Sequence, residues 1–408
     1  MPSSGASSSR PGPSGAGPSG ARSGAAARKV LLVLAGLVLL LETVPRWFSI
    51  PGLTDAELRP AYLESEDDRA FAPHPYLLYS PKPDYSGPHR DAEAGDGPAA
   101  RTFRHGPLGF REPEVGRTKP AGALRIACVG GSSTYGTGPT RDAATWPARL
   151  AADLSDARPG GTVEVLNAGV PAWTSFECLG SLAFRVLPMD PDVVLFYLAT
   201  NDAESALWPD PAADNAHYRR VWPTFRPSPL EGTLERSVLY LVWRRYLTDH
   251  LDQRADLGYQ SKRLPDGPAG ERLARFQAPE VEGPLPDQGF ESFRRNLVSM
   301  VAMARAHGAL PVLVTQGIWS DDPGSDRLLD GALRLRAHRR MTDVVREVAA
   351  AMEAPLVEAG AYLEGAAREE VERAGDQGVF SANVHLTDEG AARLAAFLAD
   401  ELRRLGAL

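Results

Sequence analysis

Cysteine is scarce in this chain: its 408 residues include only two. Two cysteines exclude a disulfide scaffold and a zinc site with four cysteine ligands. A histidine pair at helical spacing and a Cys-x-x-Cys motif are also missing, so the sequence implies no metal and no cofactor. The formal net charge of −8 at pH 7 disfavours nucleic acid as a partner.

The apolar content is high enough for a packed core. Hydrophobic residues make up 43% of the chain and charged residues 24%, which excludes a wholly disordered, collagen-like or coiled-coil protein. The length alone would allow two or three domains of about 150 residues each. Glycine and proline are frequent, at 39 and 35 residues, and predict many loops and at least one disordered stretch.

The N-terminal region contains a long apolar run. Residues 1–28 are rich in Ser, Gly and Pro and are predicted to be a disordered cytoplasmic tail. Residues 29–48, which include the unbroken apolar run Val30–Leu41, are predicted to be a membrane anchor or signal-anchor helix. The run alone is too short to cross about 30 Å of hydrocarbon, and a buried helix is the alternative.

The residues around this run predict where the protein lies. Arg28 and Lys29 precede the run and Trp47 follows it, an arrangement that would keep the tail in the cytoplasm. No Ala-x-Ala cleavage motif follows, which favours an uncleaved anchor over a removed signal peptide. We therefore expect a single-pass protein of the cytoplasmic membrane with its main domain outside the cytoplasm.

Residues 49–123 are polar and Pro-rich, with scattered aromatic side chains. This composition predicts an extended stalk or cap segment rather than a domain with its own core.

An alternation of strands and helices begins at residue 124. Short apolar runs predict five buried strands, and Ala-, Arg- and Leu-rich segments between them predict helices. The strands are 125–129, 163–167, 193–198, 311–315 and 355–358, and the helices are 144–154, 174–187, 290–307, 332–352 and 387–405. The pattern predicts an α/β fold over residues 124–408: a flavodoxin-like three-layer α/β/α sandwich with a five-stranded parallel sheet.

Residues 203–289 interrupt this alternation directly after the third strand. The segment is Pro-rich and contains many Trp and Tyr residues. We interpret it as an insertion that is either a lid or acyl-binding wall over the site, or aromatic packing beneath loops.

Polar residues stand where the predicted strands end. Ser132 follows the first strand, Gly169 the second and Asn201 the third, and His385 stands just before the last helix. Ligands of open parallel sheets bind beyond the carboxyl ends of the strands, so these residues are expected to converge. A hydroxyl, a glycine turn, a carboxamide and an imidazole are the groups that nucleophilic acyl transfer needs.

Four sequence blocks resemble the SGNH (GDSL-type) hydrolase superfamily, in its membrane-anchored bacterial branch. The blocks are Gly130-Gly131-Ser132, Asn167-Ala168-Gly169, Ala199-Thr200-Asn201-Asp202 and Ala382-Asn383-Val384-His385. Each block is a weak signal alone, but together they occur in the family's order. The resemblance covers residues 124–202 and 290–408 and implies the family's α/β/α hydrolase fold.

The resemblance also implies roles for individual residues. Ser132 would be the nucleophile and His385 the general base. The oxyanion hole would be the backbone N–H groups of Ser132 and Gly169 and the side-chain amide of Asn201. The implied protein is a serine esterase that cleaves a small-molecule or glycan acyl ester through an acyl-enzyme. O-acetyl transfer to or from a cell-envelope polysaccharide is an alternative.

The sequence departs from the family at the position of the orienting acid. Ala382 stands where the family has an Asp three residues before the His. Either a main-chain carbonyl near Ala382 or another group would orient His385, which gives a Ser–His dyad or a triad with a different acid. The candidate groups are Asp376, Ser381 and Asn383.

A third hypothesis is a non-catalytic envelope-binding protein built on a decayed hydrolase fold. Ala382, and Ala199 in place of the family's Gly, favour it.

Overall fold

The computed structural model describes residues 20–48, 70–74, 76–88, 102–111, 115–157, 160–208, 212–215, 217–218, 233–234, 236–243, 285, 287–319, 331–375 and 378–408. These residues belong to two compact units, which we treat separately. The smaller unit comprises residues 1–60 and 226–252, and the larger unit comprises residues 61–225 and 253–408. Most of the predicted tail lies outside the described residues.

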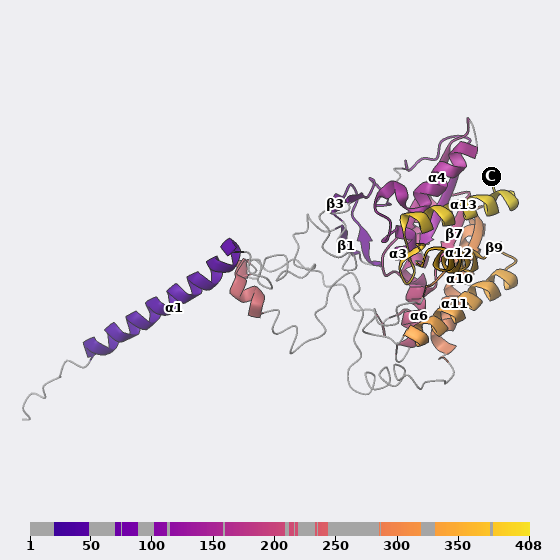
Figure 1. Ribbon diagram of the computed structural model, residues 1–408. Coiled ribbons are helices and arrows are strands. Elements are labelled where there is room, and N and C mark those ends of the chain that lie inside the picture. The colour runs from indigo at the N-terminus through magenta and orange to yellow at the C-terminus, as the bar shows by residue number, and fades with distance from the viewer. Residues whose placement is uncertain are drawn as a thin grey trace, which may run out of the picture. The chain divides into compact units, whose positions relative to one another are not determined.

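The smaller unit contains the long helix α1 (Gly20–Phe48) (Figure 1). Ten large apolar side chains between Val30 and Leu41 are 40–72% exposed. The Glu42 carboxylate accepts hydrogen bonds from the Ser237 hydroxyl and from the N–H groups of Val238 (2.8 Å) and Leu239 (3.2 Å). Glu42 thus caps the first turn of the short helix at 238–243.

The predicted anchor segment is therefore helical, but its membrane-spanning role is not supported. Among the residues that the structure describes, no helix is long and apolar enough to cross a membrane.

A five-stranded parallel sheet with the order β6-β5-β7-β8-β9 forms the centre of the larger unit. The strands are β5 (Leu124–Gly130), β6 (Val163–Gly169), β7 (Val193–Tyr197), β8 (Leu310–Val314) and β9 (Leu356–Val357). Every residue of β5 and β7 is buried, because helices cover both faces of a parallel sheet. The predicted α/β fold with its five strands is confirmed.

Alternate side chains of the strands enter two separate cores. Ile126 and Cys128 of β5 face the core formed with α4 (Trp146–Ala157), α12 (Ala359–Ala374) and α13 (Asp388–Arg404). Ala127 and Val129 face the other core. That core is formed with α5 (Ser175–Ser181), α6 (Thr200–Leu207), α10 (Asp287–Ala306) and α11 (Gly331–Ala351). The helices therefore form two layers with the sheet between them (Figure 1).

Two short antiparallel hairpins precede the sheet in sequence and lie in the segment predicted to be a stalk or cap. They are β1 (Phe71–His74) with β2 (Leu78–Pro81), and β3 (Ser86–Pro88) with β4 (Thr102–Arg104). Three aromatic side chains of their strands, Phe71, Tyr79 and Phe103, are buried in the same core as α10 and α11. The described part of residues 49–123 is therefore an integral part of the larger unit.

The predicted insertion lies mostly outside the described residues. In its described part, Trp208 and Tyr218 are buried with their ring centroids 5.5 Å apart, and the Tyr218 hydroxyl donates to Glu204 at 3.0 Å. These two aromatics pack in the core. The lid prediction itself stays untested.

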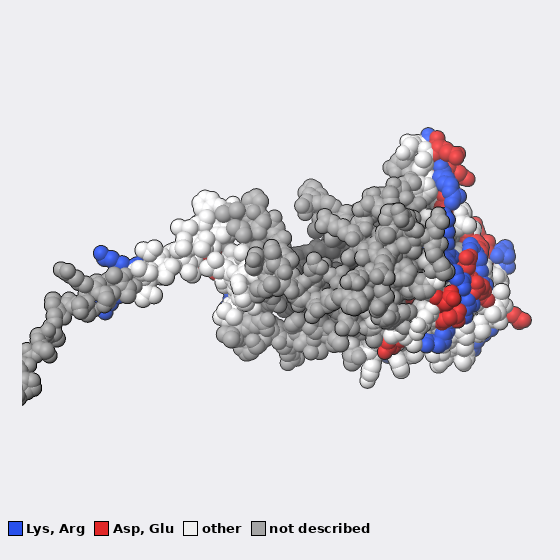
Figure 2. Space-filling view, turned by 90° about the horizontal axis from the view of Figure 1, so that it is seen from below, with Lys and Arg blue, Asp and Glu red and all other residues white. Residues whose placement is uncertain are grey.

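Charged side chains of both signs are mixed on the described surface of the larger unit (Figure 2). Ion pairs between helices contribute to this pattern, including Arg294 on α10 with Glu347 on α11, and Arg393 on α13 with Glu370 on α12 at 2.8 Å. In the described part of the face in Figure 2, no broad area carries a single sign of charge.

Arg111 connects the N-terminal hairpins to the sheet. It is 2% exposed and donates to the carbonyls of Tyr135 (2.8 Å) and Gly136 (2.7 Å) and to the Asp142 carboxylate (3.1 Å). Its guanidinium also lies 4.6 Å from the centroid of the Tyr135 ring. Since all these partners follow β5, Arg111 holds the chain in place just after that strand.

Replacing Arg111 with Met should lower the free energy of unfolding by about 2–4 kcal/mol, because buried carbonyls and a carboxylate lose their donor. Arg104 is the matched control, since it lies 3.8 Å from the same Asp142 but its side chain is 58% exposed. Arg104→Met should change the unfolding free energy by less than about 0.5 kcal/mol. Urea unfolding of both variants measures this, and equal losses would contradict the assigned role of Arg111.

Candidate active site

Ser132 begins the short helix α3 (Ser132–Tyr135), directly beyond the carboxyl end of β5. The turn before it admits no side chain. A Cβ on Gly131 would lie 2.7 Å from the amide nitrogen of Asn201. A Cβ on Gly130 would lie 2.5 Å from the Tyr197 carbonyl oxygen. The two glycines thus allow close packing that places Ser132 beside Asn201, at the strand end where parallel sheets bind ligands.

His385 faces this serine from a different part of the chain. It lies in β11 (His385–Leu386), which pairs with β10 (Phe380–Ala382). The His385 Nε2 atom is 2.8 Å from the Ser132 Oγ atom. This is the hydrogen bond through which a histidine base takes the proton of a serine nucleophile.

The neighbouring residues form a second link between the same two segments. The Ser133 hydroxyl donates to the carbonyl of Val384 at 2.8 Å. The Trp146 indole N–H donates to the Ser133 carbonyl at 3.1 Å. The turn after β5 and the β10–β11 hairpin are therefore joined at two successive residues.

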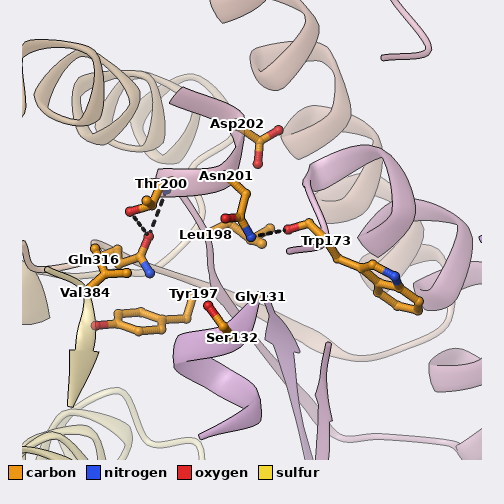
Figure 3. A pocket seen from close by; sticks show the side chains of 11 residues that line it. Gly131, Ser132, Trp173, Tyr197, Leu198, Thr200, Asn201, Asp202, Gln316 and Val384 are labelled. Carbon is orange, nitrogen blue, oxygen red and sulfur yellow. Dashed lines mark hydrogen bonds between the residues drawn. The ribbon is translucent and has the colours of Figure 1, made fainter. Parts of the chain in front are cut away.

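Asn201 reaches the same place from the first turn of α6. Its Nδ2 atom donates to the Trp173 carbonyl at 2.8 Å, which fixes the side-chain amide beside Gly131 (Figure 3). The adjacent Asp202 is 5% exposed and accepts from the N–H (2.9 Å) and hydroxyl (2.6 Å) of Ser175. Asp202 thus anchors α6 to the start of α5 and supports the position of Asn201.

Gly169 differs from its expected role in the oxyanion hole. Its N–H donates to the side-chain oxygen of Asn167 at 3.1 Å, and it is not among the residues that line the pocket. A side chain on Gly169 would collide with the backbone of Thr134 and Tyr135, so this glycine permits close packing of α3 on β6. The structure therefore brings together Ser132, Asn201 and His385 but not Gly169.

The pocket beside Ser132 is small. The space that the centre of a water-sized sphere can occupy is about 10 Å³, which is room for about one water molecule. Its walls combine aromatic and aliphatic side chains with hydroxyl, amide and carboxylate groups (Figure 3). The lining residues are Gly131, Ser132, Trp173, Tyr197, Leu198, Ala199, Thr200, Asn201, Asp202, Gln316 and Val384.

Gln316 is a pocket residue that the sequence analysis missed. It stands two positions after β8 and is 6% exposed. Its Nε2 atom donates to the Ser133 hydroxyl oxygen at 3.0 Å, and its Oε1 atom accepts from the N–H of Thr200 at 3.0 Å. Its place just beyond the carboxyl end of the fourth predicted strand is the sequence signal for a residue of the site.

His338 on α11 completes this buried network. Its Nε2 atom lies 2.8 Å from the Gln316 carbonyl and its Nδ1 atom lies 3.0 Å from the Thr200 hydroxyl. A carbonyl only accepts, so Nε2 carries the proton and Nδ1 accepts from Thr200. Burial lowers the pKa of His338 to about 4, with a further contribution from Arg334 and Arg339, so the ring is neutral at pH 7.

The groups expected to orient His385 have other bonds in the described residues. The Ser381 hydroxyl lies 3.3 Å from the His385 carbonyl oxygen, to which it donates. The Asn383 carbonyl accepts from the Trp319 N–H at 2.7 Å. Ala382 pairs with His385 across the β10–β11 hairpin, and Asp376 lies outside the described residues.

The chain belongs to the GDSL-like lipase/acylhydrolase family, whose family model matches residues 128–393. This match includes Ser132, Asn201 and His385. No curated protein sequence matches the chain.

Solved structures that resemble the chain have low identity. The lipase/acylhydrolase from Enterococcus faecalis is 15% identical, with a TM-score of 0.39 over 69% of this chain and 96% of that chain. An acetylxylan esterase from Geobacillus stearothermophilus is 13% identical, with a TM-score of 0.38 over 68% and 94%. A two-domain esterase active on acetylated mannans is 12% identical, with a TM-score of 0.39 over 69% and 49%. None of these similarities is close enough to assign a substrate to this chain.

The buried His338 should make stability depend on pH. The unfolded chain takes up this proton near pH 6.5 and the folded chain only near pH 4, so stability falls as the pH drops through this window. This one group should remove about 2 kcal/mol of unfolding free energy between pH 7 and pH 5. In urea unfolding at the two pH values, His338→Gln should lose less stability than the native protein does. Equal losses would refute the assigned protonation state.

Proposed function

We propose that this protein is a serine esterase in which Ser132 is the nucleophile and His385 the general base. The observation that carries the proposal is the 2.8 Å contact between Ser132 Oγ and His385 Nε2 at the edge of a small pocket. Membership of an acylhydrolase family supports the same reaction class. The contact also favours catalysis over a binding-only role, since a decayed site has no reason to retain it.

The reaction proceeds through an acyl-enzyme. His385 Nε2 takes the Ser132 proton as Oγ bonds to the acyl carbon, and the carbonyl oxygen becomes an oxyanion. The leaving alcohol then accepts the proton from His385 as its bond to the acyl carbon breaks. A water molecule then gives a proton to His385 Nε2 as its oxygen bonds to the acyl carbon. The bond between that carbon and Ser132 Oγ breaks, and Oγ takes the proton back from His385.

The donors proposed for the oxyanion are the N–H of Ser132 and the side chain of Asn201. Asn201 gives one of its two amide hydrogens to Trp173, and the second is available to a bound oxygen. An oxyanion-hole donor typically contributes about 2.7–4 kcal/mol of transition-state stabilisation. The N–H of Gly169 is left out, since it is bonded to Asn167.

The substrate class that we propose is a short-chain acyl ester of a small molecule or glycan. Support for a short acyl group comes from the small space beside Ser132, which has room for about one water molecule. If a sugar hydroxyl attacked the acyl-enzyme in place of water, the acyl group would pass to the sugar and the protein would be an acyltransferase.

Ser132→Ala should lower kcat/KM for a short-chain acyl ester by at least about 1000-fold, since the nucleophile is gone. The comparison uses acetyl, butyryl and octanoyl esters of one chromogenic alcohol, with and without an acetylated glycan or a sugar acceptor. The acetyl ester should be cleaved fastest.

Ser155→Ala is the control, because Ser155 is an exposed serine on α4 whose hydroxyl donates to the carbonyl of Ala151, one turn earlier in the same helix. It should keep native activity. Native protein that hydrolyses no ester, or Ser132→Ala protein that keeps native rates, would refute the proposal.

We further propose that the apolar run of α1 binds lipid and holds the protein at the cytoplasmic membrane. Support comes from the ten exposed apolar side chains between Val30 and Leu41, which form an apolar surface larger than soluble proteins usually leave in water. Arg28 and Lys29 adjoin the run and suit anionic lipid headgroups. The side of the membrane on which the catalytic unit acts stays a prediction from these charges.

Flotation with vesicles of phosphatidylglycerol and phosphatidylethanolamine tests lipid binding. The full chain should float with the vesicles, and the double variant Leu32→Glu, Leu39→Glu should remain in the dense fraction. Tyr362→Ser, which changes a 38% exposed apolar residue of the larger unit, should float like the native chain. Equal flotation of all three proteins would contradict the assignment of α1.

A further inference from the structure

A chain of hydrogen bonds leads from α11 and α6 to the residues next to Ser132 and His385. The Gln316 Oε1 atom accepts from the Thr200 N–H at 3.0 Å, which fixes the orientation of the Gln316 amide. The Thr200 hydroxyl lies 3.1 Å from this Oε1 atom and 3.0 Å from His338 Nδ1, and its proton is assigned to Nδ1, which has no proton of its own. In this orientation the Gln316 Nε2 atom is directed to Ser133. The Ser133 hydroxyl proton is then left for the Val384 carbonyl.

The last bond of this chain joins the neighbours of the two reacting side chains. Ser133 directly follows Ser132, and Val384 directly precedes His385. The segments are separated by more than 250 positions, as the 251-residue span of the Ser133–Val384 bond shows. Gln316 comes from a third element, the end of β8, and α6 and α11 hold its other side.

We propose that Gln316 is a positioning residue that keeps Ser132 and His385 in proton-transfer geometry. This proposal rests on the proposed function of these two residues. The Gln316 amide donates to the Ser133 hydroxyl oxygen. The proton of that hydroxyl is therefore directed to the Val384 carbonyl. Without the amide, Ser133 is free to rotate, and the bond that joins the two segments is lost for part of the time.

The network is rigid because it is buried and fully directed. Gln316 is 6% exposed, Ser133 4%, Thr200 5% and His338 1%, so water does not readily replace a missing partner. A misplacement of about 1 Å between reacting groups can cost about 100-fold in rate. The effect of Gln316 should therefore fall on the chemical step rather than on binding.

Gln316→Ala should lower kcat for the acetyl ester by about 10–100-fold with KM changed by less than about threefold. Arg125→Met is the control, because Arg125 is also a buried polar side chain, 0% exposed, but bonds Glu164 at 2.8 Å near the start of β5, at the end of the strand away from the site. This control should be destabilised in urea to a similar extent and keep a kcat within about twofold of the native value.

Gln316→Glu separates positioning from a loss of stability, even if the alanine variant fails to fold. A buried carboxyl has a raised pKa, and in its protonated form it can still donate to Ser133 and accept from Thr200. Once ionised it can only accept, and the link to Ser133 is broken. The ratio of variant to native kcat should therefore be highest at low pH and fall as the pH rises, because the ratio cancels the titration of the native catalytic groups.

The outcomes are distinct. Native-like kcat in Gln316→Ala, an equal loss of kcat in Arg125→Met, or a Gln316→Glu ratio that is constant with pH would each overturn the positioning role while leaving the esterase proposal intact. A native protein without esterase activity would overturn both proposals.

Discussion

The site depends on one long-range constraint. The turn after β5 and the β10–β11 hairpin are far apart in the chain, yet Ser132 and His385 must stay within 2.8 Å of each other. Neither side chain can hold this distance alone, because each lies on a short element of two to four residues. The distance is therefore set by what surrounds the two elements, namely the parallel sheet below them and the hydrogen bonds beside them.

Two buried polar groups support the turn after β5, one near its start and one at its end. Arg111 bonds the carbonyls of Tyr135 and Gly136 at the end of α3. Gln316 bonds the Ser133 hydroxyl near its start. Each group comes from a segment remote in sequence and each is almost fully desolvated. Buried polar groups are costly when unsatisfied, so these bonds favour a single arrangement of the turn over neighbouring ones.

Much of the fold could be predicted because buried parallel strands are continuous apolar runs, as Val193–Tyr197 illustrates. Ser132, Asn201 and His385 could be predicted to meet because strand ends share one edge of the sheet. The packing of the N-terminal hairpins could not, since Phe71 and Phe103 stand in Pro-rich sequence without periodicity. The bond from the Gly169 N–H to the Asn167 side chain could not be predicted either, since this contact has no local signal.

The most direct test of the account is the chemical reactivity of Ser132. After treatment of the folded native chain with a fluorophosphonate, peptide mapping by mass spectrometry should find one adduct, on Ser132. The adduct should form more slowly in His385→Gln, because the base that takes the Ser132 proton is missing. A folded native chain that gains no adduct, or one whose adduct lies on another serine, would contradict the account.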